Sequence, residues 1–114
     1  MKYLCLIYED QSKGANLPKE VIEQAMAQYH AYTSDLKQSG HCVEYGAFPP
    51  GTVTTLRVRN GKTSTTDGPY AETKEQLGVY YLLEAKDLND AIRLAEKIPS
   101  AQWGSVEVRP VMEF

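Results

Sequence analysis

The sequence predicts an α+β domain in which one antiparallel sheet is covered by two helices. Three observations support this prediction: short apolar runs of β-forming residues recur along the chain, two segments show the spacing of an amphipathic helix, and glycine or proline marks the boundaries between them. A chain of 114 residues with 42% hydrophobic residues can bury one core, so residues 1–114 are interpreted as a single domain.

The first elements are a strand over residues 2–8 and a long helix over residues 18–39. In the run KYLCLIY both alternating sets of side chains are apolar, which indicates a strand that is covered on both faces. Pro18 suits the first turn of the helix, and Gly40 suits its end. The helical spacing predicts a buried stripe made of Ile22, Ala25, Met26, Tyr29, Thr33 and Leu36.

The middle of the chain predicts a second strand and a hairpin. Residues 41–48 form another β-type run, closed by two prolines and a glycine. Two further β-prone runs follow in residues 54–66, with Asn60 and Gly61 between them. Asn-Gly at this position is the strongest short signal for a two-residue hairpin turn.

The C-terminal part predicts a strand, a helix and a last strand. Residues 76–85 are again apolar on both faces. Asp87 suits the N-cap of a helix over residues 87–98, and Pro99 ends it. The last strand contains Pro110, which cannot donate a ladder hydrogen bond, so this strand is expected at an edge of the sheet.

The order β-α-β-hairpin-β-α-β is the split βαβ, ferredoxin-like plan with an added β-hairpin. In that plan the first and third core strands are central, and these are the two runs with apolar residues on both faces. Right-handed crossovers place both helices on one face of the sheet. The other apolar face needs a cover, so we expect a homodimer with sheets face to face, a dimeric α/β barrel-like assembly that encloses space lined by tyrosines. In the alternative, the tyrosines only fill a half-solvated face.

Composition and charge exclude several classes of function. The net charge is −3 and no basic block is present, which argues against direct nucleic-acid binding. The apolar runs are too short to span a bilayer, and the first residues do not have the pattern of a signal peptide, so a cytoplasmic protein without membrane contact is expected.

The sequence also predicts neither a metal site nor a bound cofactor. It contains no zinc-type spacing of cysteine and histidine, no phosphate loop and no dinucleotide fingerprint. Cys5 and Cys42 lie in strand-like segments, so buried and reduced thiols are expected. A nucleophilic cysteine is the alternative interpretation.

The stretch TTDGPYAETKEQLG, residues 65–78, allows two interpretations. In the first, it is a turn and a short helix: Asp67 bonds its own backbone, Gly68 relaxes the steric limits, and the helix runs from about Glu72 to Gly78. In the second, Asp67 lies at the mouth of an aromatic cavity and acts as a general acid or base. Both interpretations follow from the same residues.

The residues named so far carry a resemblance to a known family. The long stretch from TTDGPY through EAKDLNDAIRLAEKIP to SVEVRPV resembles the DGPF-type branch of the YCII-related domain family, and the beginning MKYLCLIYED and the run LKQSG fit too. Tyr70 stands where the branch has phenylalanine. The resemblance implies a ferredoxin-like fold, a dimer and an enzymatic site built on a histidine and an aspartate. It also implies related lyase- or dehalogenase-like enzymes that act on ring compounds, and a link to sigma factors of the extracytoplasmic-function type.

The resemblance and the residue patterns together name candidate site residues. Asp67 lies in the branch motif and is the expected acid/base. His30 is the expected catalytic partner, although a shift of one residue would place Tyr29 in the histidine position of the family. Tyr70 and Tyr81 are expected to bind substrate. Arg57, which shares a hairpin face with Arg59, is interpreted as part of an anion clamp or as part of a solvated face.

The sequence therefore leads to two hypotheses about function. The first is a small cytoplasmic enzyme, a cofactor-free lyase or isomerase that uses an aspartate acid/base on a small cyclic or aromatic substrate. The second is a non-catalytic module that binds a ligand or a partner in sigma-factor-dependent transcription initiation. An enzyme requires Asp67 and a second titratable group to converge on one pocket, whereas a binding module requires an apolar or charged surface that faces outward.

Overall fold

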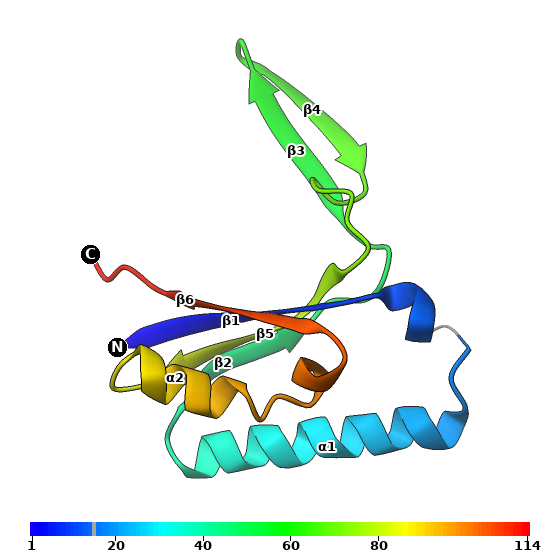
Figure 1. Cartoon of the computed structure of the whole chain (residues 1–114). Coiled ribbons are helices and arrows are strands. Elements are labelled where there is room, and N and C mark those ends of the chain that lie inside the picture. Colours follow the sequence, from blue (N-terminus) through cyan, green and yellow to red (C-terminus); the bar gives the residue numbers. More distant parts are fainter. Residues whose placement is uncertain (15) are drawn as a thin grey trace.

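A computed structural model of the chain describes residues 1–14 and 16–114 (Figure 1). The fold mixes helices with antiparallel strands, as the sequence predicts. The strands and helices, in chain order, are β1 (Lys2–Glu9), the 3₁₀ helix η1 (Gln11–Gly14), α1 (Lys19–Gln38), β2 (Cys42–Ala47), β3 (Thr54–Arg59), β4 (Lys62–Asp67), β5 (Gln76–Glu84), α2 (Leu88–Ala95), the 3₁₀ helix η2 (Pro99–Gln102) and β6 (Ser105–Pro110). Neither α1 nor α2 is long and apolar enough to cross a membrane, and this holds for every helix of the described residues.

The main sheet has four strands in the order β2-β5-β1-β6, and all neighbours are antiparallel. The two strands that are apolar on both faces, β1 and β5, are the central ones, which confirms the expectation from their side-chain pattern. Strand β6 lies at the edge, as Pro110 predicts. Proline is tolerated at an edge, because one row of backbone groups there has no strand partner and the missing N–H breaks no ladder bond.

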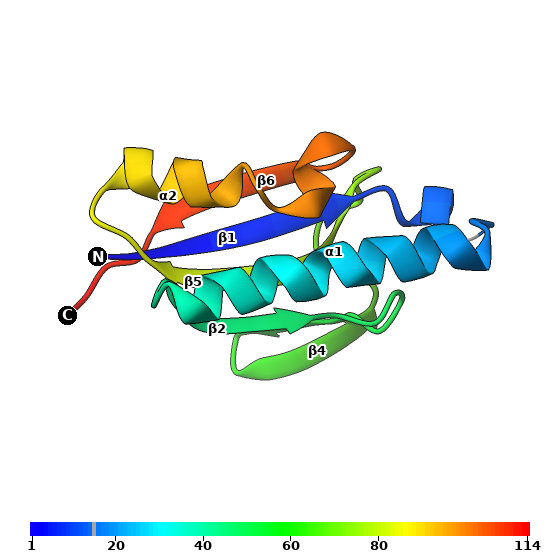
Figure 2. The same ribbon diagram turned by 90° about the horizontal axis from the view of Figure 1, so that it is seen from below.

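Both helices lie on the same face of this sheet (Figures 1 and 2). Tyr3, Cys5 and Ile7 of β1 point toward the helices and are almost inaccessible, whereas Leu4 and Leu6 point to the other face and are partly accessible. Burying a large apolar side chain contributes about 1.5–3 kcal/mol. The core is completed by side chains of α1, β5 and α2 and of the residues that follow β5 and α2, namely Tyr32, Leu36, Tyr81, Leu83, Ala85, Ala91, Leu94, Ala95 and Ile98.

Helix α1 packs on the sheet through its C-terminal half only. Tyr32 and Leu36 are buried, and the Tyr32 hydroxyl donates to the Leu94 carbonyl oxygen over 2.9 Å, which ties α1 to α2. In the N-terminal half, Ile22 and Met26 are 42% and 57% exposed. The predicted buried stripe is therefore wrong for the first turns of the helix, where apolar side chains face a groove instead of the sheet.

Helix α2 begins as its sequence predicts. The Asp87 carboxylate accepts a hydrogen bond from the backbone N–H of Asp90 over 2.8 Å, which satisfies one of the free donors of the first turn. The helix ends at Ala95, a few residues before Pro99, and the chain then forms η2. The short helix η2 was not predicted, and it carries Ser100, one of the groups of the candidate site.

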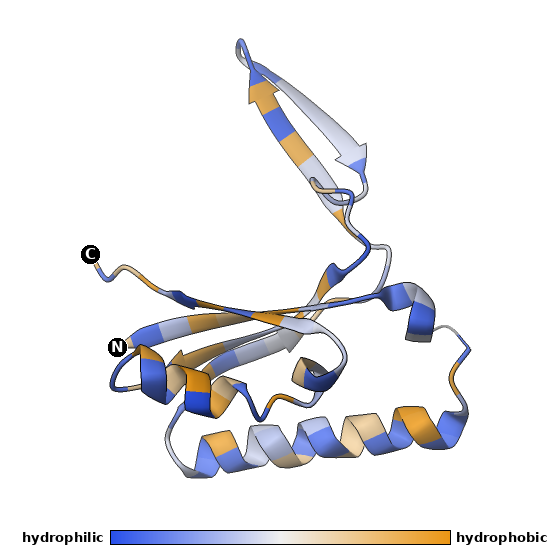
Figure 3. Cartoon of the chain, viewed as in Figure 1, coloured by the Kyte–Doolittle hydropathy of each residue, from blue (hydrophilic) through white to orange (hydrophobic). Residues whose placement is uncertain are grey.

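Strands β3 and β4 form a separate hairpin that rises from the side of the sheet opposite the helices (Figure 1). Asn60 and Gly61 both have positive φ, at 53° and 75°, which confirms the predicted two-residue turn. Hydrophobic and hydrophilic residues alternate along β3 (Figure 3), yet Leu56 and Val58 remain 60% and 53% exposed. The hairpin thus has an apolar side that stays exposed in the part of the chain that the structure describes.

The short helix predicted over residues 72–78 is wrong. This segment forms bends, and Gly78 lies inside β5. Two local bonds occupy the backbone: the Thr73 hydroxyl donates to the Glu75 carbonyl oxygen, and the Gln76 side chain donates to the Thr73 carbonyl oxygen. The pairing of Gln76 with Glu9 then extends β5 into residues that a helix would need.

Candidate functional site

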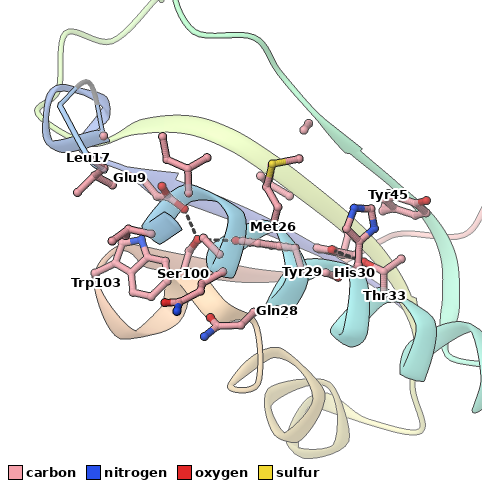
Figure 4. Close-up of a pocket in the computed structure, with 18 of the residues that line it drawn as sticks. Glu9, Leu17, Met26, Gln28, Tyr29, His30, Thr33, Tyr45, Ser100 and Trp103 are labelled. Carbon is pink, nitrogen blue, oxygen red and sulfur yellow. Dashed lines mark hydrogen bonds between the residues drawn. The ribbon is translucent and has the colours of Figure 1, made fainter. Parts of the chain in front are cut away.

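A groove of about 1110 Å³ runs along α1 on the helix-covered side of the sheet, from Val21 in the first turns to Lys37 near the end of the helix (Figure 4). The N-terminal half of α1 stands away from the sheet, while its C-terminal half is anchored by Tyr32 and Leu36. The walls are mostly apolar. The larger side chains that line it are Leu17, Ile22, Met26, Tyr29, Tyr45, Tyr81 and Trp103. A mostly apolar groove with a few polar groups is the usual form of a small-molecule site.

Three polar side chains from three elements meet at one end of the groove. Glu9 is the last residue of β1, Ser100 lies in η2 and Tyr29 lies on α1. The Ser100 hydroxyl donates to the Glu9 carboxylate, and the Tyr29 hydroxyl is hydrogen-bonded to the same Ser100 oxygen (Figure 4). Ser100 is 0% exposed, so these two partners replace the water that it would otherwise bind.

A second chain of hydrogen bonds continues from Tyr29 along the groove. The Thr33 hydroxyl donates to the Tyr29 carbonyl oxygen over 2.8 Å and lies 2.7 Å from the Tyr81 hydroxyl. Because the single hydroxyl hydrogen of Thr33 is used by the carbonyl, Tyr81 donates to Thr33. The Tyr81 ring is stacked on Tyr45 at 5.7 Å between centroids and meets Tyr32 edge to face at 5.3 Å. These contacts hold the aromatic wall in one orientation.

Tyr29 and Tyr81 of the groove are protonated at neutral pH. Burial is the main cause that raises the pKa of Tyr29; the bond to Ser100 offsets part of this effect, and the charge of Glu9 adds to it. Burial likewise raises the pKa of Tyr81. Neither phenol is therefore a nucleophilic phenolate in the resting protein, and both act through hydrogen bonds.

Three of the predicted site residues line the groove. Tyr29, His30 and Tyr81 all contribute to its surface. His30 and Tyr29 are neighbours on α1, but Tyr29 is half-buried and bonded to Ser100, whereas His30 is exposed. The groove lies on the helix-covered face, so it is a different space from the tyrosine-lined one expected between the open faces of two sheets, which stays a prediction.

The other three predicted site residues lie outside the groove. Asp67 ends β4, Arg57 lies on β3 and Tyr70 follows the hairpin; all three are exposed. The Arg57 guanidinium lies 5.4 Å from the centre of the Tyr70 ring, a cation–π contact. Within one chain, Asp67 and His30 therefore do not converge on one pocket.

The Asp67→Asn variant is expected to change the free energy of unfolding by less than about 0.5 kcal/mol. Other groups hold the turn: Gly68 N–H donates to the Val53 carbonyl oxygen over 2.7 Å, and the Thr55 hydroxyl donates to the Gly68 carbonyl oxygen over 2.6 Å. Thr55→Val, which removes that hydroxyl, should cost about 1 kcal/mol. Urea denaturation measures both. A loss in Asp67→Asn as large as in Thr55→Val would show that the charge of the Asp67 carboxylate stabilises the turn as much as the Thr55 bond does, because asparagine can make the same local bonds.

Glu9, Ser100 and Trp103 are site residues that the sequence did not indicate. In the sequence, Glu9 is the polar residue at the end of an apolar strand, and Ser100 is a residue that follows the end of a helix. Ser100 and Trp103 lie in the turn between α2 and β6, whose Gly104 N–H donates to the Ser100 carbonyl oxygen over 2.7 Å. No motif or spacing carries this arrangement, because its members come from opposite ends of the chain.

Across residues 1–14 and 16–114 no group of three or more histidine, cysteine or acidic side chains is placed to hold a metal ion. Cys5 is buried and Cys42 is half-buried. Burial raises the pKa of the Cys5 thiol to about 11 and also raises that of Cys42. Since the thiolate is the reactive form, neither cysteine has the environment of an activated nucleophile.

Both cysteines are expected to react slowly with a thiol reagent at neutral pH while the protein is folded. Cys5 should be the slower of the two, because its thiol is more deeply buried and its pKa is about 11. Mass spectrometry of the modified peptides gives the two rates, with the urea-unfolded protein as the reference. Modification of Cys5 in the native protein as fast as in urea would reopen the hypothesis of a nucleophilic cysteine.

Three comparisons with known proteins agree with the fold. The model of the YCII-related domain matches residues 1–114. The uncharacterized protein R00369 of Rhizobium meliloti (strain 1021) is 36% identical over 114 residues, which cover 97% of this chain and 92% of that protein. Among solved structures, 5-chloro-2-hydroxyhydroquinone dehydrochlorinase (TftG) of Burkholderia phenoliruptrix AC1100, in complex with 2,5-dihydroxybenzoquinone, superposes with a TM-score of 0.55. It is 17% identical, and the match covers 100% of this chain and 96% of that one.

Proposed function

Because the chain belongs to the YCII-related domain family, we propose that it is a small cytoplasmic enzyme of acid/base type that acts on a small cyclic or aromatic substrate. The reaction class is a lyase or isomerase step that needs no cofactor. The groove between α1 and the sheet is the proposed site. A protein that processes small molecules fits both the family and the dehydrochlorinase that shares the fold.

The single observation that carries this proposal is the groove itself. Its size, about 1110 Å³, accommodates a substituted six-membered ring with room to spare. Tyr45 and Trp103, which are exposed, supply aromatic surfaces against which such a ring can stack. At the same end as Trp103, the bonded set of Glu9, Ser100 and Tyr29 offers hydroxyl and carboxylate groups for proton transfer.

The ring class also draws support from TftG. The complex of that protein holds 2,5-dihydroxybenzoquinone, a six-membered ring with two hydroxyl groups, and the enzyme is named as a dehydrochlorinase of a chlorinated hydroxyhydroquinone. At 17% identity the likeness supports the fold, and the proposal extends the ligand class to this chain. Independently of TftG, the tyrosine-rich groove of this chain suits a flat, hydroxylated ring, because its walls are aromatic and carry hydroxyl groups.

The proposal includes the DGPF-type branch and a ferredoxin-like fold. The residues Asp67, Gly68, Pro69 and Tyr70 support the branch. The strand order β2-β5-β1-β6, with both helices on one face, supports the ferredoxin-like assignment. Gly68 has φ +117°, a conformation that favours glycine, which explains why the motif needs this residue type after the aspartate.

The proposed assembly is a homodimer through the open face of the sheet. Leu4, Leu6, Tyr80 and Leu82 share that face and are half-buried in the single chain. The hairpin rises from the same side (Figure 1), so in a face-to-face dimer it would lie against the partner. The charge distribution fits this arrangement. Residues 54–67 carry Arg57, Arg59, Lys62 and Asp67, a net charge of +2. Since the whole chain has a net charge of −3, the rest of the chain has a net charge of −5, and the hairpin of one copy is attracted to the body of the other.

Binding of hydroxylated rings is the direct test. Hydroquinone, whose hydroxyl groups keep their hydrogens at neutral pH, is titrated into the wild type, the Ala25→Trp variant and the Ala71→Trp variant, with calorimetry as the readout. Ala25 lines the groove and Ala71 is an exposed residue outside it, so only the first tryptophan fills the site. Ala25→Trp should lose at least tenfold in affinity, whereas Ala71→Trp should bind as the wild type does. Equal binding by all three proteins, or no binding by the wild type, would contradict the proposed site.

A second candidate function is a non-catalytic module for a ligand or for a partner in sigma-factor-dependent transcription initiation. One observation favours it: Asp67 and Arg57 lie outside the groove, on an exposed hairpin. An exposed element with charged residues is where the contact surface of a binding module is expected. The two functions differ in turnover. Conversion of a bound ring compound by the wild type supports the enzyme. A loss on the order of a hundredfold in Asp67→Asn would in addition assign the acid/base role to Asp67 rather than to the groups of the groove. Ring binding without any conversion supports the module.

A further inference from the structure

The direction of each hydrogen bond at the end of the groove follows from counting hydrogens. An ionised carboxylate only accepts, and a serine hydroxyl has a single hydrogen to donate. Since Ser100 donates that hydrogen to Glu9, it has none left for Tyr29. The bond between Ser100 and Tyr29 must therefore be donated by the Tyr29 hydroxyl. The whole chain runs in one direction, from Tyr29 through Ser100 to Glu9.

This direction decides what Tyr29 can offer to a ligand. Tyr29 lines the groove, and its only hydroxyl hydrogen points to Ser100 (Figure 4). Its oxygen still has lone pairs that can accept a hydrogen bond. Because burial raises the pKa of Tyr29, the phenol keeps its hydrogen at neutral pH and the direction does not reverse. To a molecule in the groove, Tyr29 is an acceptor.

We propose that Tyr29, Ser100 and Glu9 form a proton relay that selects a neutral ring hydroxyl as its ligand and ends on Glu9 as the proton acceptor. The inference rests on the proposed function, which it narrows to one class of substrate. These are phenols and related ring alcohols, whose hydroxyl group donates a hydrogen bond to the Tyr29 oxygen. A phenolate lacks the hydrogen that Tyr29 requires. Neither Glu9 nor Ser100 belongs to the histidine and aspartate pair expected from the family resemblance.

The proton step balances along the chain. The O–H bond of the ligand breaks and its proton goes to the Tyr29 oxygen; the Tyr29 proton passes to Ser100, and the Ser100 proton passes to the Glu9 carboxylate. The products are an oxyanion on the ligand and a neutral Glu9 carboxyl group, so the net charge is unchanged. A ring oxyanion is the electron-rich form from which a neighbouring leaving group is expelled or a double bond migrates.

Other titratable groups face the same groove. From every element that lines it these are Glu9 and Asp10, Lys13 of η1, Tyr29, His30 and Lys37 of α1, Tyr45 of β2 and Tyr81 of β5. Lys37 is occupied at the Tyr45 end, where its ammonium lies 3.3 Å from the Tyr45 hydroxyl. The charges of the two carboxylates and the two ammonium groups that line the groove cancel. The selection of a neutral ligand therefore follows from hydrogen-bond direction and not from the net charge of the groove.

The test uses para-nitrophenol, whose absorption distinguishes phenol from phenolate, and para-nitroanisole, which has the same ring but no hydroxyl hydrogen. For the wild type, the affinity for para-nitrophenol should fall about tenfold per pH unit above the pKa of the probe. At lower pH, para-nitrophenol should bind about tenfold more tightly than the anisole, the value of one hydrogen bond. The wild-type titration needs no variant, so the inference is tested even if a substitution impairs folding.

Three variants assign the effect to the relay. Tyr29→Phe should abolish the advantage of para-nitrophenol over para-nitroanisole. Glu9→Gln should weaken the preference for phenol over phenolate, because a neutral amide no longer forces the direction of the Ser100 bond. Tyr45→Phe is the matched control: it removes a hydroxyl from the same groove but outside the relay, so the preference should remain.

The outcomes separate this inference from the proposed function. Tight binding of the phenolate, equal binding of phenol and anisole by the wild type, or an unchanged ratio in Tyr29→Phe would overturn the relay and leave the groove as a ring site. Failure of both probes to bind would overturn the relay and the proposed function together.

Discussion

Replacing Gly104 with alanine is expected to lower the free energy of unfolding by about 2–4 kcal/mol. A Cβ atom at this position would overlap the backbone carbonyl oxygen of Tyr8 and lie 3.2 Å from that of Ser100. Backbone cannot move aside as the end of a flexible side chain can, so either the end of β1 or the turn before β6 must shift. For a domain of this size the loss corresponds to a fall in melting temperature of roughly 10 °C or more.

Gly78→Ala is the matched control for Gly104→Ala. Gly78 lies in β5, and an added Cβ there would meet no atom within 4 Å. Its melting temperature should stay within a few degrees of the wild type, since alanine has no steric conflict there. Scanning calorimetry measures both variants. Equal stability of Gly104→Ala and Gly78→Ala would show that the turn before β6 yields without cost.

The same substitution should also impair the candidate site. Gly104 closes the turn that holds Ser100 and Trp103 in the wall of the groove, through the bond from its N–H to the Ser100 carbonyl oxygen. A shift of this turn moves Ser100 relative to Glu9 and Tyr29, which belong to other elements. Ring binding is therefore expected to weaken in the folded fraction of Gly104→Ala, but not in Gly78→Ala.

Leu82→Glu is expected to convert a homodimer into a monomer. The wild type should sediment at micromolar concentration with twice the 12.8 kDa mass of the chain. Leu82 lies at the middle of the open sheet face, opposite Leu4 on the neighbouring strand, and a glutamate there would have to be desolvated in the interface. The dissociation constant should rise at least about thirtyfold, as for a residue at the centre of an interface.

The monomer itself should tolerate Leu82→Glu, because this position faces solvent when the partner is absent. Circular dichroism should therefore show an unchanged fold. Ile92→Glu is the matched control: Ile92 is 45% exposed on α2, on the helix side of the sheet, so this variant should remain a dimer. A monomeric wild type, or a dimer that survives Leu82→Glu, would contradict the face-to-face assembly.

Most of the secondary structure could be predicted because its signals are local. The period of two in β1 and β5, the Asn60-Gly61 turn and the Asp87 cap depend on residues within a few positions of one another, and the structure confirms all of them. The short helix predicted after Asp67 failed for a non-local reason. Pairing of Gln76 with Glu9 draws that segment into β5, and no local propensity reports this pairing.

The candidate site divides in the same way. Tyr29 and Tyr81 could be predicted, because helical phase and strand alternation show which side chains face inward. His30 was named from the family resemblance, and it lines the groove as an exposed side chain. Asp67 and Tyr70 were grouped with them from the motif and the resemblance, and Arg57 from the alternation of charged residues along the hairpin, yet the structure places all three on or beside the hairpin. Their share in a site therefore stays a prediction, which the Asp67→Asn variant tests.

By itself the sequence determined the α+β class, the central strands, the edge position of β6 and the hairpin, since periodicity, proline and turn residues act over short distances along the chain. Only the tertiary structure decided where the groove lies and which groups meet in it. Helix α1 leaves the sheet at its N-terminal half, and Ser100 meets Tyr29 and Glu9 across 71 and 91 positions of sequence. Contacts of that range arise from packing of the whole domain, because each partner is positioned by an element whose location depends on all the others.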